Sequence, residues 1–308
     1  MPRKPRSTRS HRIPLPHLAL ATVLLAILAL PGCRAASAQP SHTDLLDLFE
    51  EWRAFERPQF VDGVPQYTAE AMAAQQRALA SWKERLWAFD IEAWPVEQQI
   101  DWHLVRAEMN GLDFDHRLRR PWARDPAFYV MMYPAESDVP AHEGPVIHGW
   151  IDTWTYEMPL STADAAELAA RFGSIPTLLD QARTNLADSN ARDLWEAGIR
   201  SFRGQASDLA AYAEEVRGVS SDLDAALATA EVASREFGDW IAETLPSKTG
   251  DSGIGKDAYT WYMQNVHLVP YSWEEQVTLM RRELARSHAS LRLEENRNRD
   301  LPELERIA

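Results

Sequence analysis

The fold class is set by residues 199–240, which read IRSFRGQASDLAAYAEEVRGVSSDLDAALATAEVASREFGDW. Apolar residues recur here at alternating steps of three and four, the spacing that places them on one face of an α-helix. They are Ile199, Phe202, Ala206, Leu209, Ala213 and Val216, and, after a turn at 218–221, Leu223, Ala226, Ala230, Ala233, Phe237 and Trp240. The pattern predicts a helical hairpin in which alanines let the backbones approach closely and bulky side chains fill the seam.

Helical periodicity also dominates the rest of the chain, and strand signals are scarce. Further helices are expected over 43–56, over 68–89, in a stretch opened by Pro95, near 256–267 and over 273–296. Thr68 is a suitable cap for the second of these, and Ser272 with Glu275 forms a capping box at the start of the last. We therefore predict an all-α protein, a multi-helix array built around the long hairpin.

Residues 120–160 depart from this pattern. They hold six prolines, which prevent a long helix, and seven aromatic residues, which are costly to leave in water. We expect an ordered, irregular segment that is pinned onto the helices, and long ordered loops are often functional. The alternative is that this segment only covers the hydrophobic core. A second break, at 246–255, is the best candidate for a linker.

The chain is strongly acidic beyond its first 38 residues. Those 38 contain six of the 32 Lys and Arg residues and no acid, so residues 39–308 carry a net charge of −20, against −14 for the whole chain. Such a charge disfavours binding to nucleic acid and to anionic lipid, which both attract basic surfaces. An apolar content of 45% excludes wholesale disorder. Cys33 is the only cysteine, which excludes an intrachain disulfide and a thiolate zinc site.

Residues 1–38 have the organisation of an export signal. A basic stretch precedes the apolar run at 18–30, which is too short to span a bilayer comfortably. Residues 30–33 (Leu-Pro-Gly-Cys) resemble a bacterial lipobox, in which Cys33 would be acylated, whereas residues 36–38 (Ala-Ser-Ala) suit ordinary signal peptidase. An uncleaved anchor is a third alternative. All three place residues 39–308 outside the cytoplasm, either lipid-anchored in the cell envelope or free in the periplasm or medium.

The sequence contains no complete catalytic motif. The zinc-binding pattern His-Glu-x-x-His holds two imidazoles one helical turn apart, and none of the nine histidines forms it. The nearest approach is His142-Glu143 with His148, in which the histidines are six residues apart around a Gly-Pro pair. A bent loop could still bring them to one metal. Neither a Gly-x-Ser-x-Gly elbow nor a phosphate-binding loop is present.

A long stretch near the end, residues 253–299, has a specific order of short motifs. It reads GIGKDAYTWYMQNVHLVPYSWEEQVTLMRRELARSHASLRLEENRNR. Together with the segments at 120–126, 175–176 and 185–186, it resembles the domain-of-unknown-function 885 family of exported bacterial proteins. The resemblance covers most of residues 43–308.

The resemblance implies a largely helical protein, often with a lipoprotein leader, that is related to gluzincin-type zinc metallopeptidases. Such enzymes hydrolyse peptide bonds with a metal-bound water and a glutamate as general base. Family members are nearly twice as long, and their His-Glu metal segment lies in the C-terminal half, to which nothing here corresponds. Zinc is thus implied for the full-length protein, while no metal ligand and no catalytic residue is assigned to this chain.

The last residues read like an unfinished helix. Residues 300–304 carry a cap, an early proline and an early acid, yet the chain stops about two turns later at Ala308. We therefore expect residues 39–308 to be the N-terminal helical part of the family domain, truncated at its C-terminus. A missing C-terminal half is expected to dock on it.

The best candidates for contact with a substrate are Tyr259, Tyr262, Asn265 and His267. Hydroxyl groups and an amide on one helix face can bind a peptide backbone or steady an oxyanion. Core packing is the alternative, because aromatic residues at helical spacing usually serve it.

Two functions from different classes remain open. The first is the N-terminal helical portion of an exported zinc-metallopeptidase-like hydrolase that acts on peptides, with its metal-binding segment outside this chain. The second is a non-catalytic helical envelope lipoprotein that serves as a scaffold or binding module. Both touch the membrane only through a lipid on Cys33, and neither takes a nucleic-acid partner.

Overall fold

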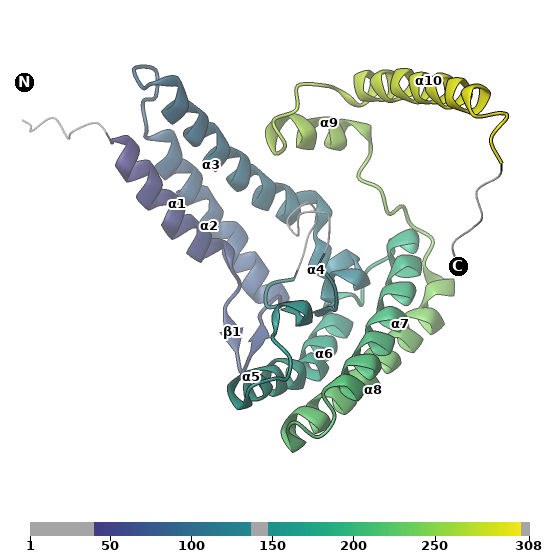
Figure 1. Cartoon of the computed structure of the whole chain (residues 1–308). Coiled ribbons are helices and arrows are strands. Elements are labelled where there is room, and N and C mark those ends of the chain that lie inside the picture. Colours follow the sequence, from purple (N-terminus) through teal and green to yellow (C-terminus); the bar gives the residue numbers. More distant parts are fainter. Residues whose placement is uncertain (1–39, 137–146, 303–308) are drawn as a thin grey trace, which may run out of the picture. The chain divides into compact units, whose positions relative to one another are not determined.

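The computed structural model describes residues 40–136 and 147–302, and helices dominate them (Figure 1). The helices are α1 (His42–Glu56), α2 (Ala69–Trp87), α3 (Val96–Phe114), α4 (Pro121–Arg124), α5 (Thr162–Gly173), α6 (Ile175–Asn185), α7 (Arg192–Glu215), α8 (Ser221–Thr244), α9 (Lys256–Asn265) and α10 (Trp273–Arg297). The strands are β1 (Phe60–Val61), β2 (Val64–Pro65), β3 (Met132–Tyr133) and β4 (Ile151–Asp152). The all-α class is confirmed. Within these residues no helix combines the length and the apolar character needed to cross a membrane.

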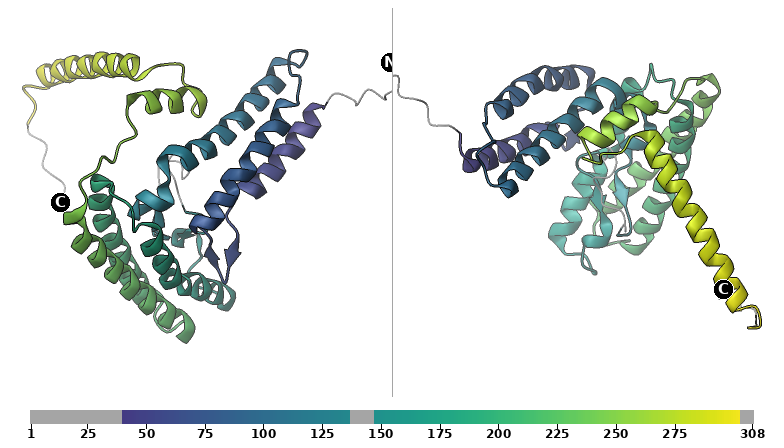
Figure 2. Two further views of the ribbon diagram at one scale, coloured as in Figure 1. Left: turned by 180° about the vertical axis from the view of Figure 1, so that it is seen from behind. Right: turned by 90° about the horizontal axis from the view of Figure 1, so that it is seen from above.

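The predicted hairpin is confirmed as α7 and α8, which run side by side (Figures 1 and 2). Its fully buried seam residues are Phe202, Leu209, Val216, Leu223, Ala230 and Phe237. Phe202 and Phe237 meet edge to face with their ring centroids 4.6 Å apart. Gly218 has a φ of 78°, a conformation that glycine adopts without strain, and it reverses the chain between the two helices.

The hairpin also holds a buried polar contact that periodicity did not predict. The Gln205 side chain on α7 donates from Nε2 to the Ser234 hydroxyl on α8 at 2.9 Å. Its Oε1 accepts from the backbone N–H groups of Met131 and Met132 at 2.6 and 3.2 Å. One buried amide therefore joins both arms of the hairpin to the irregular segment.

The irregular segment is ordered and buried, as predicted, in its described part. Tyr129 is fully buried, and its hydroxyl donates to the Trp122 carbonyl at 2.6 Å. Further along, β3 and β4 pair in parallel, and the N–H of Ile151 donates to the Met131 carbonyl at 2.6 Å. Trp154 is different, because 45% of it is exposed. Residues 137–146 lie outside the described residues.

The first three helices form a second apolar core. Its buried residues are Leu45, Leu48, Trp52, Leu79, Leu86, Trp102, Val105 and Met109. The Thr68 cap is confirmed, since its side chain accepts from the N–H of Ala71 at 3.2 Å. Trp87, at the end of α2, lies at the edge of this core: it is 62% exposed and covers Trp102 from outside, with ring centroids 5.1 Å apart.

The last two helices depend on few contacts. α9 packs on α3, and α10 packs on α9, where the N–H of Trp273 donates to the Thr260 hydroxyl at 3.0 Å. The capping box of Ser272 and Glu275 is confirmed. From Leu284 to the end of α10 every residue is exposed. The second half of α10 therefore lacks the tertiary packing from which most helices gain their stability.

Two glycines of α7 allow a matched test of the contact between the hairpin and the irregular segment. A Cβ at Gly198 would lie 2.8 Å from the Cβ of Pro126, whereas one at Gly204 would meet nothing within 4 Å. We expect Gly198→Ala to lower the free energy of unfolding by about 1–3 kcal/mol through overpacking. Gly204→Ala should raise it by up to about 1 kcal/mol through helix propensity. Urea denaturation of both variants measures the free energy of unfolding. Equal changes in the two variants would contradict the close contact between Gly198 and Pro126.

Candidate functional site

The structure places three of the four substrate candidates near the end of α3: Tyr262 and Asn265 of α9, and His267 just after that helix. Tyr262 packs on the buried Phe114 ring at 4.7 Å, and its hydroxyl accepts from Arg119 at 3.3 Å. The His267 ring lies 5.0 Å from that of Tyr262, and the Asn265 carbonyl accepts from the Asn110 side chain at 3.1 Å.

The remaining candidate points elsewhere. The Tyr259 hydroxyl donates to Gln276 of α10 at 3.0 Å, and its ring packs edge to face on Trp273. These contacts dock α9 between its two neighbouring helices. A contact of the four residues with a substrate stays a prediction.

Arg119 anchors the α9 contact within a π-helical turn at 115–119 that ends α3. Its Nε lies 2.5 Å from the Asp115 carboxylate, and its guanidinium stacks over the Tyr262 ring. Burial raises the pKa of Asp115, while the bond to Arg119 opposes that rise. Because π-helical turns often occur at functional sites, this end of α3 is a candidate region for function.

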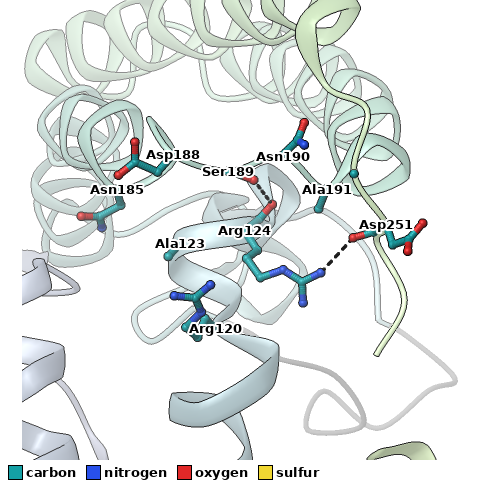
Figure 3. Close-up of a pocket in the computed structure, with 10 residues that line it drawn as sticks. Arg120, Ala123, Arg124, Asn185, Asp188, Ser189, Asn190, Ala191 and Asp251 are labelled. Atoms are coloured by element: carbon teal, nitrogen blue, oxygen red, sulfur yellow. Dashed lines mark hydrogen bonds between the residues drawn. The ribbon is translucent and has the colours of Figure 1, made fainter. Parts of the chain in front are cut away.

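A cavity of about 360 Å³ lies between α4, the loop that follows α6, and the chain near Gly250 (Figure 3). Its wall is held by backbone bonds: the N–H of Gly250 donates to the Asn190 carbonyl at 2.8 Å. The Ser189 hydroxyl donates to the Arg124 carbonyl at 2.9 Å and accepts from the Trp195 indole at 2.8 Å. The break at 246–255 is thus fastened to the loop after α6.

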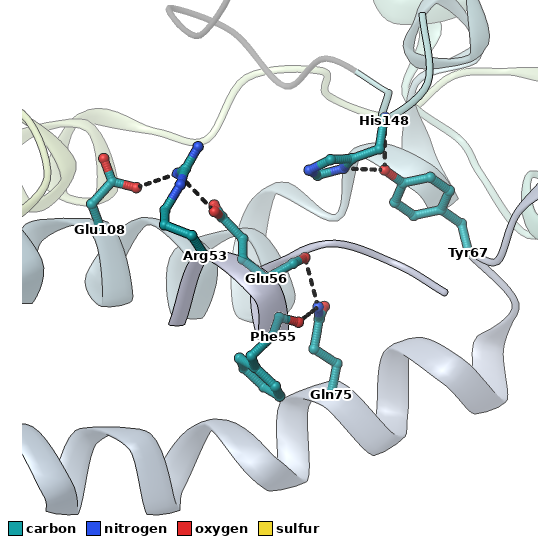
Figure 4. Close-up of polar contacts among 7 residues, drawn as sticks. All are labelled: Arg53, Phe55, Glu56, Tyr67, Gln75, Glu108 and His148. Atoms are coloured by element: carbon teal, nitrogen blue, oxygen red, sulfur yellow. Dashed lines mark hydrogen bonds and ion pairs between the residues drawn. The ribbon is translucent and has the colours of Figure 1, made fainter. Parts of the chain in front are cut away.

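A second polar site, here called the Tyr67–His148 cluster, gathers around the end of α1 (Figure 4). It consists of Arg53, Glu56, Tyr67, Gln75, Glu108, His116 and His148. A tight β-hairpin turn at Asp62-Gly63, both with positive φ, leads the chain from α1 back to Tyr67. No sequence motif links these positions, so sequence reasoning missed all of them except His148.

Tyr67 makes two hydrogen bonds to His148. The backbone N–H of His148 donates to the Tyr67 hydroxyl at 3.1 Å, and the hydroxyl oxygen lies 2.8 Å from Nδ1 of the same histidine, which suits a hydroxyl that donates to a neutral ring. An imidazole that accepts at Nδ1 is neutral and carries its proton on Nε2. Burial, together with the charges of Arg57 and Arg53, lowers the pKa of His148 to about 4.

The carboxylate part of the cluster joins α1, which carries Arg53 and Glu56, to α3, which carries Glu108. Arg53 lies 2.8 Å from Glu56 and 3.3 Å from Glu108, and burial raises the pKa of Glu56. The Gln75 amide donates to the Glu56 carbonyl at 2.9 Å, and its Oε1 lies 2.9 Å from Nε2 of the buried His116. Burial lowers the pKa of His116. Ionisable groups with shifted pKa values gather at functional sites, which makes this cluster a candidate.

Two sequence candidates cannot be placed: Cys33 and the His142-Glu143 pair lie outside the described residues. Among the residues that are described, no three His, Cys, Asp or Glu side chains come close enough together to hold a metal ion. His148, the described member of the 142–148 motif, uses Nδ1 for Tyr67.

The titration of His148 predicts an acid-sensitive contribution to stability. Its pKa of about 4 in the folded chain lies below the ordinary 6.5, so protonation favours unfolding. The contribution is complete above about pH 6.5 and shrinks as the pH falls toward 4. Between pH 7 and 5, His148→Asn, which keeps an acceptor for Tyr67, should lose about 1–2 kcal/mol less stability than the natural chain.

Urea denaturation at the two pH values measures this difference. His288→Asn is the matched control, because His288 is exposed on α10. Its pH dependence should equal that of the natural chain. If His148→Asn also behaves like the natural chain, the bond between Tyr67 and a neutral His148 is wrong.

Comparison with known proteins gives a family and a fold. The family model described as bacterial protein of unknown function (DUF885) matches residues 56–300. No curated protein matches the chain. A solved structure described as "a putative lipoprotein of unknown function from Shewanella oneidensis" matches with a TM-score of 0.50 and 18% identity. The match covers 72% of this chain and 40% of the Shewanella chain, so at this identity it shows a shared fold over a part of that protein. Because the family model spans most of the chain, the chain belongs to the DUF885 family of bacterial proteins.

Proposed function

We propose that this chain is the helical portion of an exported zinc-metallopeptidase-like hydrolase whose metal ligands lie outside the described residues. The proposal starts from the gluzincin relationship that the family resemblance implies. It gains support from the Shewanella protein, which extends well beyond the part that this chain matches. A peptide is the substrate class that this relationship favours.

The observation that carries the proposal is an apolar row on α10 that packs on α9 at its first residue and is exposed from Met280 onward. Trp273, Val277, Met280, Leu284 and Leu291 follow one another at steps of 4, 3, 4 and 7, which places them on one helix face. Met280 is 71% exposed, and Leu284 and Leu291 are exposed as well. A lone amphipathic helix gains little stability in water, so this face favours a partner. We propose that a further segment of the same polypeptide packs on this face of α10.

No catalytic step is assigned to the described residues, in which no three His, Cys, Asp or Glu side chains gather as metal ligands would. Their role in the proposed enzyme is to build and position one side of the region in which a peptide binds.

The proposed location is the cell envelope. The leader at 1–38 has the organisation of an export signal, and the Shewanella protein is described as a lipoprotein. Cys33 is the proposed site of lipid attachment, and residues 39–308 form the proposed exported part.

Metal content and peptidase activity test the proposal on two polypeptides. The first is residues 39–308, and the second is the product of the complete gene, including any codons after Ala308. We expect the first to bind zinc far below one equivalent and to cleave no peptide. The second should bind about one zinc per chain and hydrolyse peptides. His142→Ala should leave the metal content of the first unchanged.

Two results would contradict the proposal. One is stoichiometric zinc in residues 39–308 that His142→Ala removes. The other is a gene that ends at Ala308 and whose product cleaves peptides. A gene that ends there and yields an inactive, zinc-free protein favours the scaffold alternative instead.

The α10 face gives a separate prediction for residues 39–308. We expect this polypeptide to bind a hydrophobic dye and to self-associate, because its apolar row is uncovered. A double variant, Leu284→Glu with Leu291→Glu, should lower dye fluorescence and self-association. Leu293→Glu is the control, since Leu293 is 66% exposed on another face of the same helix. A monomer that binds no dye, or equal effects of both variants, would contradict the assignment.

A further inference from the structure

The cavity in Figure 3 carries charges of both signs that do not neutralise each other. Arg120 and Asp188 both line it, and within the described residues neither forms an ion pair at 4.0 Å or less. Both side chains are exposed, so a ligand in the cavity can approach each charge without first breaking an ion pair. The volume, about 360 Å³, lies in the range of small-molecule sites.

Arg120 reaches the cavity from a strained backbone. Its φ of 39° and ψ of 58° are left-handed, which costs a residue other than glycine about 1–2 kcal/mol. The N–H of Arg120 donates to the Asp115 carbonyl at 2.7 Å, and the next residue, Pro121, is buried. Strain that the surroundings enforce in this way is concentrated at functional sites.

One further cation makes the wall around Arg120 more positive. The Arg124 guanidinium donates to the carbonyls of Leu118, Asp251 and Ser252 at 3.2–3.3 Å, and these neutral partners leave its charge intact. The buried Lys248 ammonium lies on the side of Asp188 instead, where it donates to the Ser189 carbonyl at 2.7 Å. A carboxylate on the ligand would be attracted to the Arg120 side of the cavity.

Asp188 and Asn185 make the opposite wall suitable for N–H donors. The Asp188 carboxylate can accept from an ammonium group. The Asn185 side chain donates from Nδ2 to the Tyr67 carbonyl and the Tyr129 hydroxyl at 2.9 and 2.8 Å, which leaves its Oδ1 as an acceptor. These bonds hold the amide in place before any ligand arrives, and such preorganisation favours binding.

We propose that this cavity binds a small zwitterion, an α-amino acid or a dipeptide, with its carboxylate at Arg120 and its ammonium at Asp188. A zwitterion fits better than a simple anion because it meets both charges. It also carries no net charge, so the acidic surface of residues 39–308 does not repel it as it repels an anion. This binding proposal is independent of the proposed hydrolase activity, because its test measures only ligand binding.

The test is calorimetric titration of the purified full chain with four probes. Alanyl-alanine carries both charges, N-acetylalanine only the carboxylate, alaninamide only the ammonium, and inorganic phosphate is the plain anion. We expect alanyl-alanine to bind most tightly and phosphate to bind no better than N-acetylalanine. Arg120→Gln should weaken alanyl-alanine and N-acetylalanine about tenfold and leave alaninamide unchanged, and Asp188→Asn should weaken alanyl-alanine and alaninamide about tenfold.

Two companion variants keep the test decisive. Arg120→Gly removes the guanidinium and also the strain, because glycine adopts this φ freely, so it should fold at least as well as the natural chain and still lose binding. Arg203→Gln, at an exposed position of α7, should change nothing. The proposal fails if alanyl-alanine does not bind at about 10 mM, if phosphate binds as tightly, or if folded Arg120→Gly keeps full affinity.

Discussion

The buried amide of Gln205 is the contact on which the arrangement of the helices depends. An irregular segment has backbone N–H groups that no neighbouring turn satisfies, and leaving them buried without a partner costs about 1–3 kcal/mol each. Gln205 accepts two of them, from Met131 and Met132, and donates to Ser234 on the other arm of the hairpin. An apolar residue at this position would fill the space but leave three polar groups unsatisfied.

A second chain of side-chain bonds begins at Tyr129, two residues before Met131. Tyr129 donates to the Trp122 carbonyl and accepts from Asn185 of α6, and Asn185 also donates to the Tyr67 carbonyl. The Tyr67 hydroxyl in turn bonds Nδ1 of His148. The cavity wall and the Tyr67–His148 cluster therefore share one rigid support. A change at Asn185 would reach both sites, because buried polar networks respond as a unit.

Features that depend on local spacing, such as helices and their caps, were predictable from the sequence. Contacts between residues far apart in the chain were not. Phe202, Leu209 and Phe237 repeat at helical steps, so the hairpin was predictable from their spacing. Ser272 and Glu275 lie within one turn, so their cap was predictable as well. Tyr67 and His148 are 81 residues apart, and no local rule joins them. The exposure of Trp87 was not predictable either, because helical spacing places a residue on a face without showing how far the neighbouring helix extends.

The end of α3 shows how strain at one residue is maintained by its neighbours. Phe114 and His116 are buried on one side of Arg120, and Trp122 is buried on the other. The His116 ring packs on that of Trp122 at 4.9 Å, so the chain must reverse within a few residues to bury all three. A π turn followed by one left-handed residue achieves this, and burial of Phe114, which contributes about 1.5–3 kcal/mol, together with that of Trp122 outweighs the cost of the single strained conformation. The fold therefore keeps Arg120 in place whether or not a ligand occupies the cavity.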